Sequence, residues 1–469
     1  MATPEEAIAL ALSLLRAGHL DAASSLLAQI LDDTPNHPDA LHYSGLLKAR
    51  QGDAEGAVGL VRRAVEGDPA NLPAWNNLGN LFMRLDRLDE AAEAYRTCLA
   101  LQPDHPQALS NLGLLMRVSG DIEGAEALYR RALQARPDFP EALNNLGAIG
   151  LAYGDLPAAE LLLARAVELE PRFPGARLNL GKALAGQGRL AEAATHYWEA
   201  IALGSREGVA HKLLIYALVE TGRRDEALET ARRWHRDAPD DAVARHHLAA
   251  LSGEDVPARA TDAYVEATFD AFAETFDAAL DKLDYRAPQL VAGAVAALHP
   301  TPEARLLTLD AGCGTGLCAP LLRPYAARLD GMDLSAGMLA HAARRGLYDR
   351  LDKAEIEAGM AARPRAYDLI ACADTLCYFG DLSGVLAAAV GALRPGGALV
   401  FTVEALDGDT GAFRLHPGHG RYAHAPAYVA ASAAAAGLEV AGMSREILRR
   451  EGAQAVQGLV VACRKPETT

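Results

Sequence analysis

The sequence predicts two structural parts: an all-helical array of repeats, followed by an α/β domain with a seven-stranded, mostly parallel sheet. Two observations support this fold class. In the first half of the chain, proline and small residues recur every 34 positions. From Ala304 onward, short apolar runs alternate with helical stretches. We therefore expect the array over residues 1–252, a linker and helical lid over 253–300, and the α/β domain over 301–469.

The composition excludes several classes of partner and site. Among 469 residues, 61 acidic and 45 basic side chains give a net charge of -16, which disfavours nucleic acids and anionic membranes as partners. The six cysteines include no C-x-x-C pair, so we expect neither a disulfide framework nor a metal site. Glu5 and Glu6 stand where a signal peptide is basic, and no apolar run approaches the ~18 residues of a spanning helix. These features predict a cytoplasmic protein.

About seven units of 34 residues share one register. Small residues mark the place where the two helices of a unit touch, and proline ends the second helix. Because no unit can bury its apolar face alone, the units are expected to stack into a solenoid. The register is carried by proline at 35, 69, 103, 137, 171 and 239, with Ser205 in one slot, and by glycine at 45, 79, 113, 147 and 181.

The unit PAWNNLGNLFMRLDRLDEAAEAYRTCLALQPDH resembles the tetratricopeptide (TPR) repeat, at Trp75, Leu78, Gly79, Phe82, Ala91, Tyr95 and Pro103. The resemblance implies a TPR solenoid whose first helices line a groove for a protein or peptide partner. One position of this first helix carries an amide in four consecutive repeats: Asn77, Asn111, Asn145 and Asn179. A ladder of side-chain amides can bind an extended peptide backbone. The alternative is that asparagine is simply common at this position of the TPR pattern.

An apolar stripe follows the array, before the first predicted strand. Its members are spaced by four, three, four and four, which predicts one helix; they are Val265, Phe269, Phe272, Phe276 and Leu280. The stripe is either an ordinary packing face or a lid over the site that follows, with Tyr285 and Arg286 at its exit.

The first predicted strand ends in a glycine-rich loop. Asp310 to Gly316 read D-A-G-C-G-T-G, and a helix is predicted to follow. Glycines allow a tight turn and let a ligand approach backbone amides. A dinucleotide fingerprint would need glycine where Leu317 stands. The D-x-G-x-G-x-G spacing instead resembles motif I of class I S-adenosylmethionine (SAM) dependent methyltransferases, which implies a Rossmann-like domain.

Further matches follow in the order of that family. Asp333 ends the second predicted strand, 21 residues after Gly312, where an acidic side chain accepts the ribose hydroxyls. Glu355 ends the third, KAEIE, on the adenine side, and L-R-P-G-G at 393–397 precedes the fifth. The resemblance implies SAM as cofactor, bound by Asp310, Gly312, Cys313, Gly314, Gly316, Asp333, Leu334, Glu355, Ile356, Asp374, Tyr285 and Arg286.

Methyl transfer from a sulfonium needs mainly alignment of the acceptor and exclusion of water. A base is needed only for a protonated acceptor, and a histidine is suited to that at neutral pH. We expect His424 in this role, with Tyr422 and Tyr378 shaping the acceptor pocket, although a histidine exposed in a loop is the alternative. The C-terminal stretch, with R-Y-A-H and L-R-x-E segments, resembles predicted bacterial methyltransferases that carry TPR repeats.

These observations lead to the hypothesis of a SAM-dependent methyltransferase with an unidentified acceptor, whose array recruits a protein, a carrier-bound substrate or a partner. Two alternatives remain open. The enzyme could methylate a free small molecule and use the array for assembly, or the chain could be an adaptor with a SAM-binding structural domain. Methylation of nucleic acid is disfavoured because the run after the fourth strand lacks the N/D-P-P-[FYW] motif.

Overall fold

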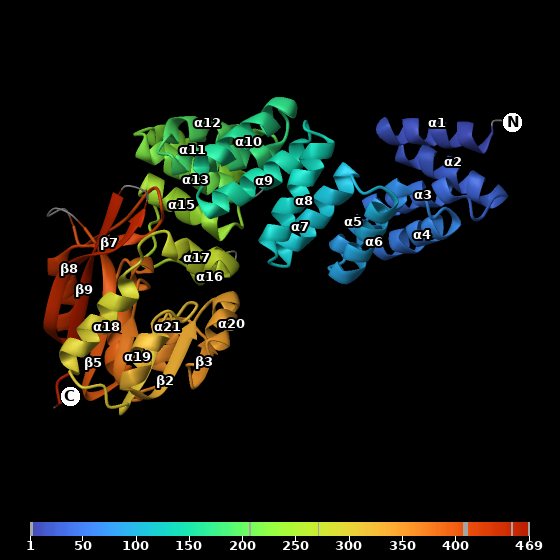
Figure 1. Ribbon diagram of the computed structural model, residues 1–469. Helices are drawn as coiled ribbons and strands as arrows, with labels where there is room; N and C mark the ends of the chain where they lie inside the picture. Colours follow the sequence, from blue (N-terminus) through green and yellow to red (C-terminus); the bar gives the residue numbers. More distant parts are fainter. Residues whose placement is uncertain (1–2, 206–207, 271, 407–410, 452–453, 468–469) are drawn as a thin grey trace. The chain divides into compact units, whose positions relative to one another are not determined.

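The computed structural model describes residues 3–205, 208–270, 272–406, 411–451 and 454–467. The chain divides into two compact units, one formed by residues 1–187 with 199–205 and the other by 188–198 with 206–469 (Figure 1). Each is taken by itself below. Within the described ranges, no helix is both long enough and apolar enough to cross a bilayer.

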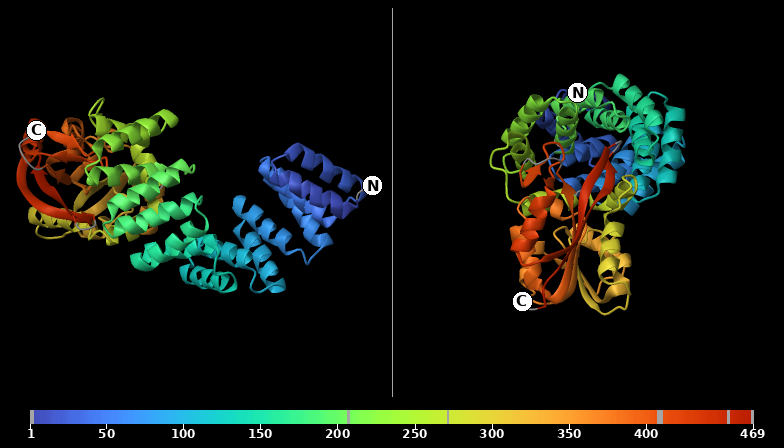
Figure 2. Two further views of the ribbon diagram at one scale, coloured as in Figure 1. Left: turned by 90° about the horizontal axis from the view of Figure 1, so that it is seen from above. Right: turned by 90° about the vertical axis from the view of Figure 1, so that its left-hand side faces the viewer.

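Each 34-residue period forms a pair of helices, which confirms the predicted array. The left view of Figure 2 shows the pairs of the first unit in a row. Helix α15 (Ala242–Ser252) ends the series at Gly253, which has a left-handed backbone. The paired helices are α1 (Pro4–Arg16), α2 (Leu20–Asp33), α3 (Pro38–Arg50), α4 (Ala54–Gly67), α5 (Leu72–Arg84), α6 (Leu88–Leu101), α7 (Pro106–Val118), α8 (Ile122–Ala135), α9 (Pro140–Tyr153), α10 (Leu156–Leu169), α11 (Pro174–Gly186), α12 (Leu190–Ala202), α13 (Gly208–Glu220) and α14 (Arg224–Asp237).

Local chemistry explains where these helices begin and how closely they pack. The Asp53 side chain caps α4 by accepting a hydrogen bond from the Gly56 amide at 2.8 Å, and Asp121 caps α8 in the same way. Gly79 of α5 lies against the ring of Tyr95 on α6, where an added Cβ would lie 2.4 Å from a ring carbon. The recurring glycine is therefore the point of closest approach within a repeat.

The second unit contains the α/β domain, in which the described residues form one sheet of nine strands. Strands β3, β2, β1, β4 and β5 pair in this order and are parallel, and β9 then adds antiparallel to β5, with β8 beside it. The strands are β1 (Leu306–Ala311), β2 (Ala326–Asp333), β3 (Arg350–Lys353), β4 (Tyr367–Cys372), β5 (Leu393–Ala405), β6 (Phe413–Leu415), β7 (Tyr422–His424), β8 (Glu439–Glu451) and β9 (Gln454–Arg464). Figure 2 shows the β8–β9 hairpin in red.

Two strand predictions were wrong. The seven expected strands are joined by β6 and β7, a short antiparallel pair whose β7 extends the end of β5 at Glu404 and Ala405. The third strand is Arg350–Lys353, not 353–357, because Glu355 caps a helix: its carboxylate accepts hydrogen bonds from the amides of Glu357 and Ala358 at 3.0 and 2.7 Å.

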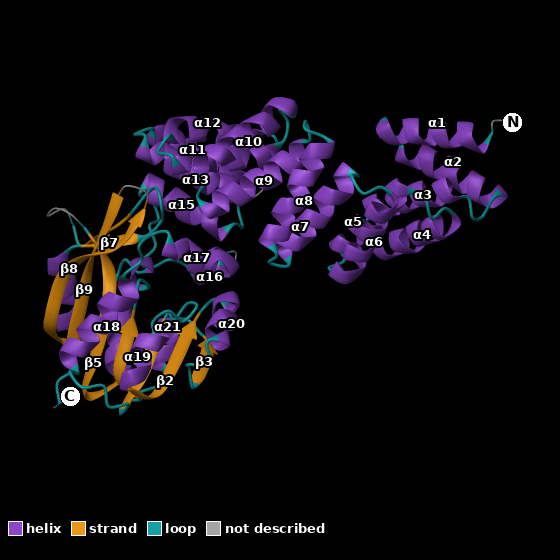
Figure 3. Ribbon diagram, viewed as in Figure 1, coloured by secondary structure: helices purple, strands orange, loops and turns teal. Residues whose placement is uncertain are grey.

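Helices cover both faces of this sheet (Figure 3). Side chains alternate along the strands: in β4, Leu369 and Ala371 pack with α18 and α19, while Ile370 and Cys372 pack with α21 and α22. A mostly parallel sheet buried on both faces is typical of Rossmann-like methyltransferase domains. The helices of this part are α16 (Asp262–Asp270), α17 (Phe276–Asp281), α18 (Ala287–Leu298), α19 (Ala319–Leu322), α20 (Ala336–Arg344), α21 (Ile356–Ala361), α22 (Ser383–Ala392) and α23 (Pro426–Ala435), with 3-10 turns at Ala273–Thr275, Arg323–Tyr325 and Leu376–Tyr378.

The apolar stripe does not form the single helix that its spacing predicts. Helix α16 ends at Asp270, a 3-10 turn follows at Ala273–Thr275, and α17 begins at Phe276. Two acidic side chains anchor the pieces separately: Asp270 accepts from the Ser335 hydroxyl, and Asp277 accepts from Arg345 at 2.5 Å. These tertiary contacts outweigh the local periodicity.

Candidate functional site

A cavity of about 290 Å³ lies at the carboxyl ends of the parallel strands. Its wall includes the loop after β1, the ends of β2 and β4, the segment before α21, and the broken helix α16–α17. Open α/β sheets bind ligands in this position. Of the predicted cofactor residues, it brings together Gly312, Cys313, Gly314, Asp333, Leu334, Glu355, Ile356, Asp374 and Tyr285.

The glycine loop brings the backbone of residues 312–314 to the cavity wall. Gly312, Gly314 and Gly316 have φ values of 73°, 53° and 86°, in the left-handed region that glycine adopts without strain. At Gly312 the space is also closed, because an added Cβ would lie 2.4 Å from the Thr375 side chain. The Gly312 amide donates to the Met332 carbonyl at 2.9 Å, which ties the loop to β2.

Asp333 lies at the end of β2 with both carboxylate oxygens oriented. Its Oδ2 accepts from the Gly314 amide and its Oδ1 from the Ser335 amide, each at 2.9 Å. Burial raises the pKa of Asp333, and these backbone hydrogen bonds oppose that shift. Because each carboxylate oxygen can accept a second hydrogen bond, the group can still receive a pair of hydroxyls.

Three predicted cofactor residues lie outside the cavity wall. Asp310 is buried and accepts from the Tyr348 hydroxyl at 2.6 Å. Burial raises the pKa of Asp310 to about 7, and the charge of Asp333 adds to the effect. Gly316 faces the Tyr348 ring, 3.0 Å from its added Cβ, and the Arg286 amide donates to the Leu448 carbonyl at 2.8 Å. These residues support the site from behind.

The helical segment contributes the apolar side of the cavity, and all five stripe residues line it. Phe269 meets Tyr378 edge to face, with ring centroids 5.4 Å apart. Phe276 meets Phe269 and Phe272 in the same way, at 6.0 and 5.8 Å. Such offset contacts favour aromatic packing, so this wall can hold an apolar or aromatic group and exclude water.

The structure does not place two of the expected catalytic residues at the cavity. His424 is fully buried, and its Nε2 donates to the Gly380 carbonyl at 3.2 Å. Burial lowers the pKa of His424 to about 4. The Tyr422 hydroxyl donates to the Pro257 carbonyl at 2.7 Å. Because β7 pairs with the end of β5, these side chains belong to the core, and only Tyr378 lines the cavity.

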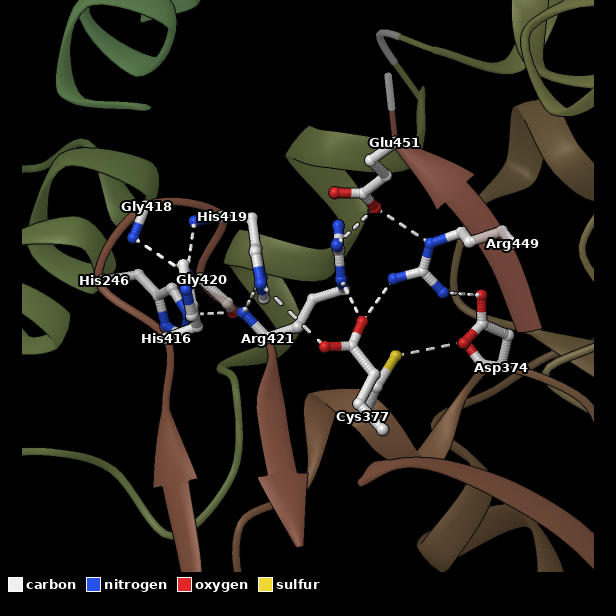
Figure 4. A network of polar contacts seen from close by, with 11 residues as sticks. His246, Asp374, Cys377, His416, Gly418, His419, Gly420, Arg421, Arg449 and Glu451 are labelled. Atoms are coloured by element: carbon white, nitrogen blue, oxygen red, sulfur yellow. Dashed lines mark hydrogen bonds and ion pairs between the residues drawn. The ribbon is translucent and has the colours of Figure 1, made fainter. Parts of the chain in front are cut away.

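Sequence reasoning missed a buried ion network at the far end of the cavity (Figure 4). Arg449 donates to Asp374 at 2.6 Å, to Glu451 at 2.9 Å and to Glu404. Arg421 donates to Glu404 at 2.6 Å and to Glu451 at 2.5 Å. No local pattern in the sequence reveals this network, because Arg449 and Asp374 are 75 positions apart.

Opposite charges shift the pKa values of Arg449 and Glu404 toward their charged forms. Burial alone would lower the pKa of Arg449, but the carboxylates of Asp374, Glu404 and Glu451 raise it well above its ordinary value. Burial likewise raises the pKa of Glu404, and the two arginines lower it below its ordinary value. Paired charges of this kind are strongly interdependent, because removal of one leaves another buried without a partner.

The asparagine ladder of the array is linked from repeat to repeat. The side-chain amide of Asn111 donates to Asn76 at 2.9 Å and to Asn80 at 3.0 Å, and Asn179 donates to Asn144 at 2.9 Å. Asn77 contacts the His42 ring at 2.9 Å, while Asn145 accepts from Asn144 at 3.4 Å. The amides of the ladder therefore tie repeats together. Among the described residues, nothing donates to the side-chain oxygens of Asn77, Asn111 and Asn179.

In the described ranges, no group of three or more His, Cys, Asp or Glu is arranged to hold a metal ion. All six cysteines are buried and free.

Two family models match the chain. A methyltransferase domain model matches residues 309–401. A tetratricopeptide repeat model matches residues 8–71, 76–140, 117–177, 151–208 and 178–242. The chain therefore carries N-terminal TPR repeats followed by a class I methyltransferase domain, a domain that uses SAM.

Curated relatives share part of the second half. Methyltransferase-like protein 27 of Homo sapiens is 43% identical over 84 residues, 18% of this chain and 34% of the relative. Ubiquinone biosynthesis O-methyltransferase of Sodalis glossinidius is 31% identical over 98 residues, 20% of this chain and 39% of the relative. Malonyl-[acyl-carrier protein] O-methyltransferase of Acetivibrio thermocellus is 33% identical over 102 residues, 21% of this chain and 36% of the relative. The chain thus spans between a third and two fifths of the length of these relatives, which are distant homologues.

Proposed function

We propose that this protein transfers a methyl group from SAM to an acceptor held at the aromatic and charged end of the cavity. One observation carries the proposal. The sheet order β3, β2, β1, β4 sets Glu355, Asp333, the loop at Gly312 and Asp374 in a row along one cavity. This row fits an elongated cofactor with an adenine, a ribose and a charged amino-acid end.

The residues present fit SAM at each of these ends. Glu355 and Ile356 would hold the adenine, and Asp333 would accept the ribose hydroxyls with the lone pairs that its backbone contacts leave. Asp374 lines the cavity, and its buried Oδ1 has no hydrogen-bond partner among the described residues. An unpartnered buried oxygen is costly, and a cationic group of the cofactor would remove that cost.

SAM supplies an activated methyl group on a sulfonium. The chain's own residues align the acceptor and exclude water. Phe269, Phe276 and Tyr378 form an apolar wall, and Glu451 and Arg421 add polar atoms to the lining. The buried, neutral His424 is not needed for this chemistry.

The acceptor is proposed to be an oxygen nucleophile on an apolar or aromatic body. Two relatives are named as O-methyltransferases, one of them acting on an acyl-carrier protein. A repeat array suggests protein interaction, which supports an acceptor presented by a protein or carrier. The free side-chain oxygens of the asparagine ladder would then accept hydrogen bonds from the backbone of that partner.

Calorimetric titration with SAM tests the cofactor step. The unaltered protein should bind SAM, and Asp333→Ala should weaken binding at least tenfold by removing both ribose acceptors. Asp349→Asn is the matched control, because this half-exposed carboxylate pairs with Arg323 and lies outside the cavity wall. Absence of SAM binding by the unaltered protein would refute the proposal.

A second experiment tests recruitment. The doubly substituted protein Asn111→Ala, Asn179→Ala is supplied with methyl-labelled SAM in a cell extract, and labelled products are measured by mass spectrometry. Reduced labelling of a protein product supports recruitment, with Asn36→Ala, outside the ladder, as control. Undiminished labelling favours a free small-molecule acceptor. SAM binding without any labelled product favours the adaptor alternative.

A further inference from the structure

We propose that Arg421 is a positioning residue for the acceptor end of the cavity, and that helix α15 holds it in place through His246. The inference rests on the proposed function, because it assigns a role within the same site. It also means that the last helix of the array is part of the catalytic unit.

Arg421 is the link between the cavity and the loop at 416–420. Arg421 lines the cavity, and its guanidinium contacts two carboxylates from different strands: Glu404 near the end of β5 and Glu451 at the end of β8. Both carboxylates also contact Arg449, which holds Asp374. The planar fork of an arginine requires a defined geometry for two such contacts. A shift of Arg421 would therefore disturb Glu404 and Glu451, the two carboxylates that it contacts.

The loop before Arg421 is internally braced. The Nδ1 atom of His416 accepts hydrogen bonds from the amides of Gly418 and His419, at 3.2 and 3.4 Å. The rings of His416 and His419 stack with centroids 3.8 Å apart and planes 3° from parallel. The His416 amide donates to the Arg421 carbonyl at 2.8 Å. These contacts hold the loop together, and an outer anchor helps to set the position of Arg421.

That outer anchor is helix α15. The Nε2 atom of His246 lies 2.8 Å from the Gly420 carbonyl (Figure 4). Because a carbonyl only accepts, Nε2 carries the proton and His246 donates. Burial lowers the pKa of His246, which keeps the ring neutral at neutral pH. His246 is itself held by stacking on Tyr264, with ring centroids 3.9 Å apart.

Gly420 has no room for a side chain at this contact. Its φ is +71°, and an added Cβ would lie 2.9 Å from the Tyr264 hydroxyl and 3.1 Å from His246 Cδ2. The glycine thus allows the loop to approach α15 closely enough for the hydrogen bond. The path from the array to the cavity is continuous: His246, Gly420, Arg421, then the carboxylates shared with Arg449.

The test uses the full-length chain with four variants. His246→Ala removes the donor, His246→Gln restores a donor at a similar reach, and Gly420→Ala closes the gap. His247→Gln is the matched control, because His247 is equally buried on the same helix but packs against Trp234 and Tyr264, with no hydrogen bond to the loop among the described residues. Four quantities are measured: the melting temperature by circular dichroism, the SAM dissociation constant by calorimetry, label transfer into a cell extract at saturating SAM, and amide hydrogen exchange of residues 416–424 and 445–451.

We expect His246→Ala and Gly420→Ala to reduce transfer about tenfold and to speed exchange in both segments. SAM affinity should change by less than about threefold, because the glycine loop and Asp333 are untouched. His246→Gln should recover most of the transfer, and His247→Gln should resemble the unaltered protein.

Three outcomes would overturn the inference. Unchanged exchange in 445–451 would show that the loop does not hold the network. Full transfer with a lower melting temperature would show that the His246–Gly420 contact stabilises the fold without positioning Arg421. Loss of SAM affinity in proportion to transfer would indicate general unfolding. Failure of the proposed function gives a different result, because the unaltered protein would then bind no SAM. The hydrogen-exchange experiment would still decide whether His246 holds the loop and the network in place.

Discussion

The Arg449 guanidinium donates a hydrogen bond to the Asp374 carboxylate at 2.6 Å. Asp374 has a left-handed backbone, with φ of 52°, and its amide donates to the Thr402 hydroxyl at 2.7 Å. A non-glycine residue in this region is strained unless its surroundings hold it. The last hairpin of the chain therefore holds Asp374, which follows β4 along the chain and lines the cavity.

Arg449→Gln is expected to destabilise the second unit by about 3 to 5 kcal/mol, because it leaves Asp374 and Glu404 buried with fewer cations. Urea unfolding followed by circular dichroism measures the effect. Arg450→Gln is the control: Arg450 is half-exposed and lies 3.9 Å from Asp284, so about 0.5 kcal/mol or less is expected. Equal losses in the two variants would contradict the assignment of the network.

Gly312→Ala should abolish SAM binding. The new methyl group would lie within 2.4 Å of the Thr375 side chain, on a backbone with φ of 73°. Both strain and contact would move the loop away from the cofactor. Gly293→Ala, an exposed helix position with nothing within 4 Å of the added Cβ, should leave binding unchanged and stabilise α18 slightly. Calorimetry on the two variants separates them; tight binding by Gly312→Ala would show that the loop does not contact the cofactor.

Buried histidines should make the fold sensitive to mild acid. Burial lowers the pKa of His424 to about 4, below the ordinary value of 6.5. Between these two pH values the unfolded chain binds more protons than the folded chain. The contribution of His424 to the free energy of unfolding is therefore largest above pH 6.5 and falls as the pH decreases. His424 alone should cost about 2 kcal/mol at pH 5. Urea unfolding at pH 7.5 and pH 5 measures the loss, and His424→Gln should reduce the difference by that amount. An unchanged difference would contradict the assigned pKa.

Gly79→Ala should destabilise the array by about 1 to 3 kcal/mol through overpacking, because the Tyr95 ring lies 2.4 Å from the added Cβ. Gly59→Ala, on the exposed face of α4 with nothing within 4 Å, should instead raise stability by up to about 1 kcal/mol. Thermal unfolding by circular dichroism compares them. A melting temperature that rises in both variants would mean that helix propensity outweighs the contact.

Periodicity predicted the elements of the array well, because each repeat is a local structure whose helices contact neighbours in sequence. The loop at Gly312 and the acid at Asp333 were also predictable, since a strand, a tight turn and a helix follow one another within a short segment. The sequence pattern predicts a strand at Glu355. In the structure its side chain instead caps a helix, through hydrogen bonds to amides two and three residues ahead. The break after Asp270 arises from contacts with Ser335 and Arg345, which no local pattern contains.

The amino-acid sequence by itself determined the repeat period, the succession of most strands along the chain and the residues of the glycine loop. All of these depend on interactions between positions close in the chain or on a regular pattern. Only the tertiary structure decided that His424 lies in the core, that Asp310 supports the site from behind, and that Arg421 and Arg449 share carboxylates at the cavity. The physical reason is that the environment of a charged or polar side chain, in water or buried beside a counter-charge, is set by segments distant in sequence.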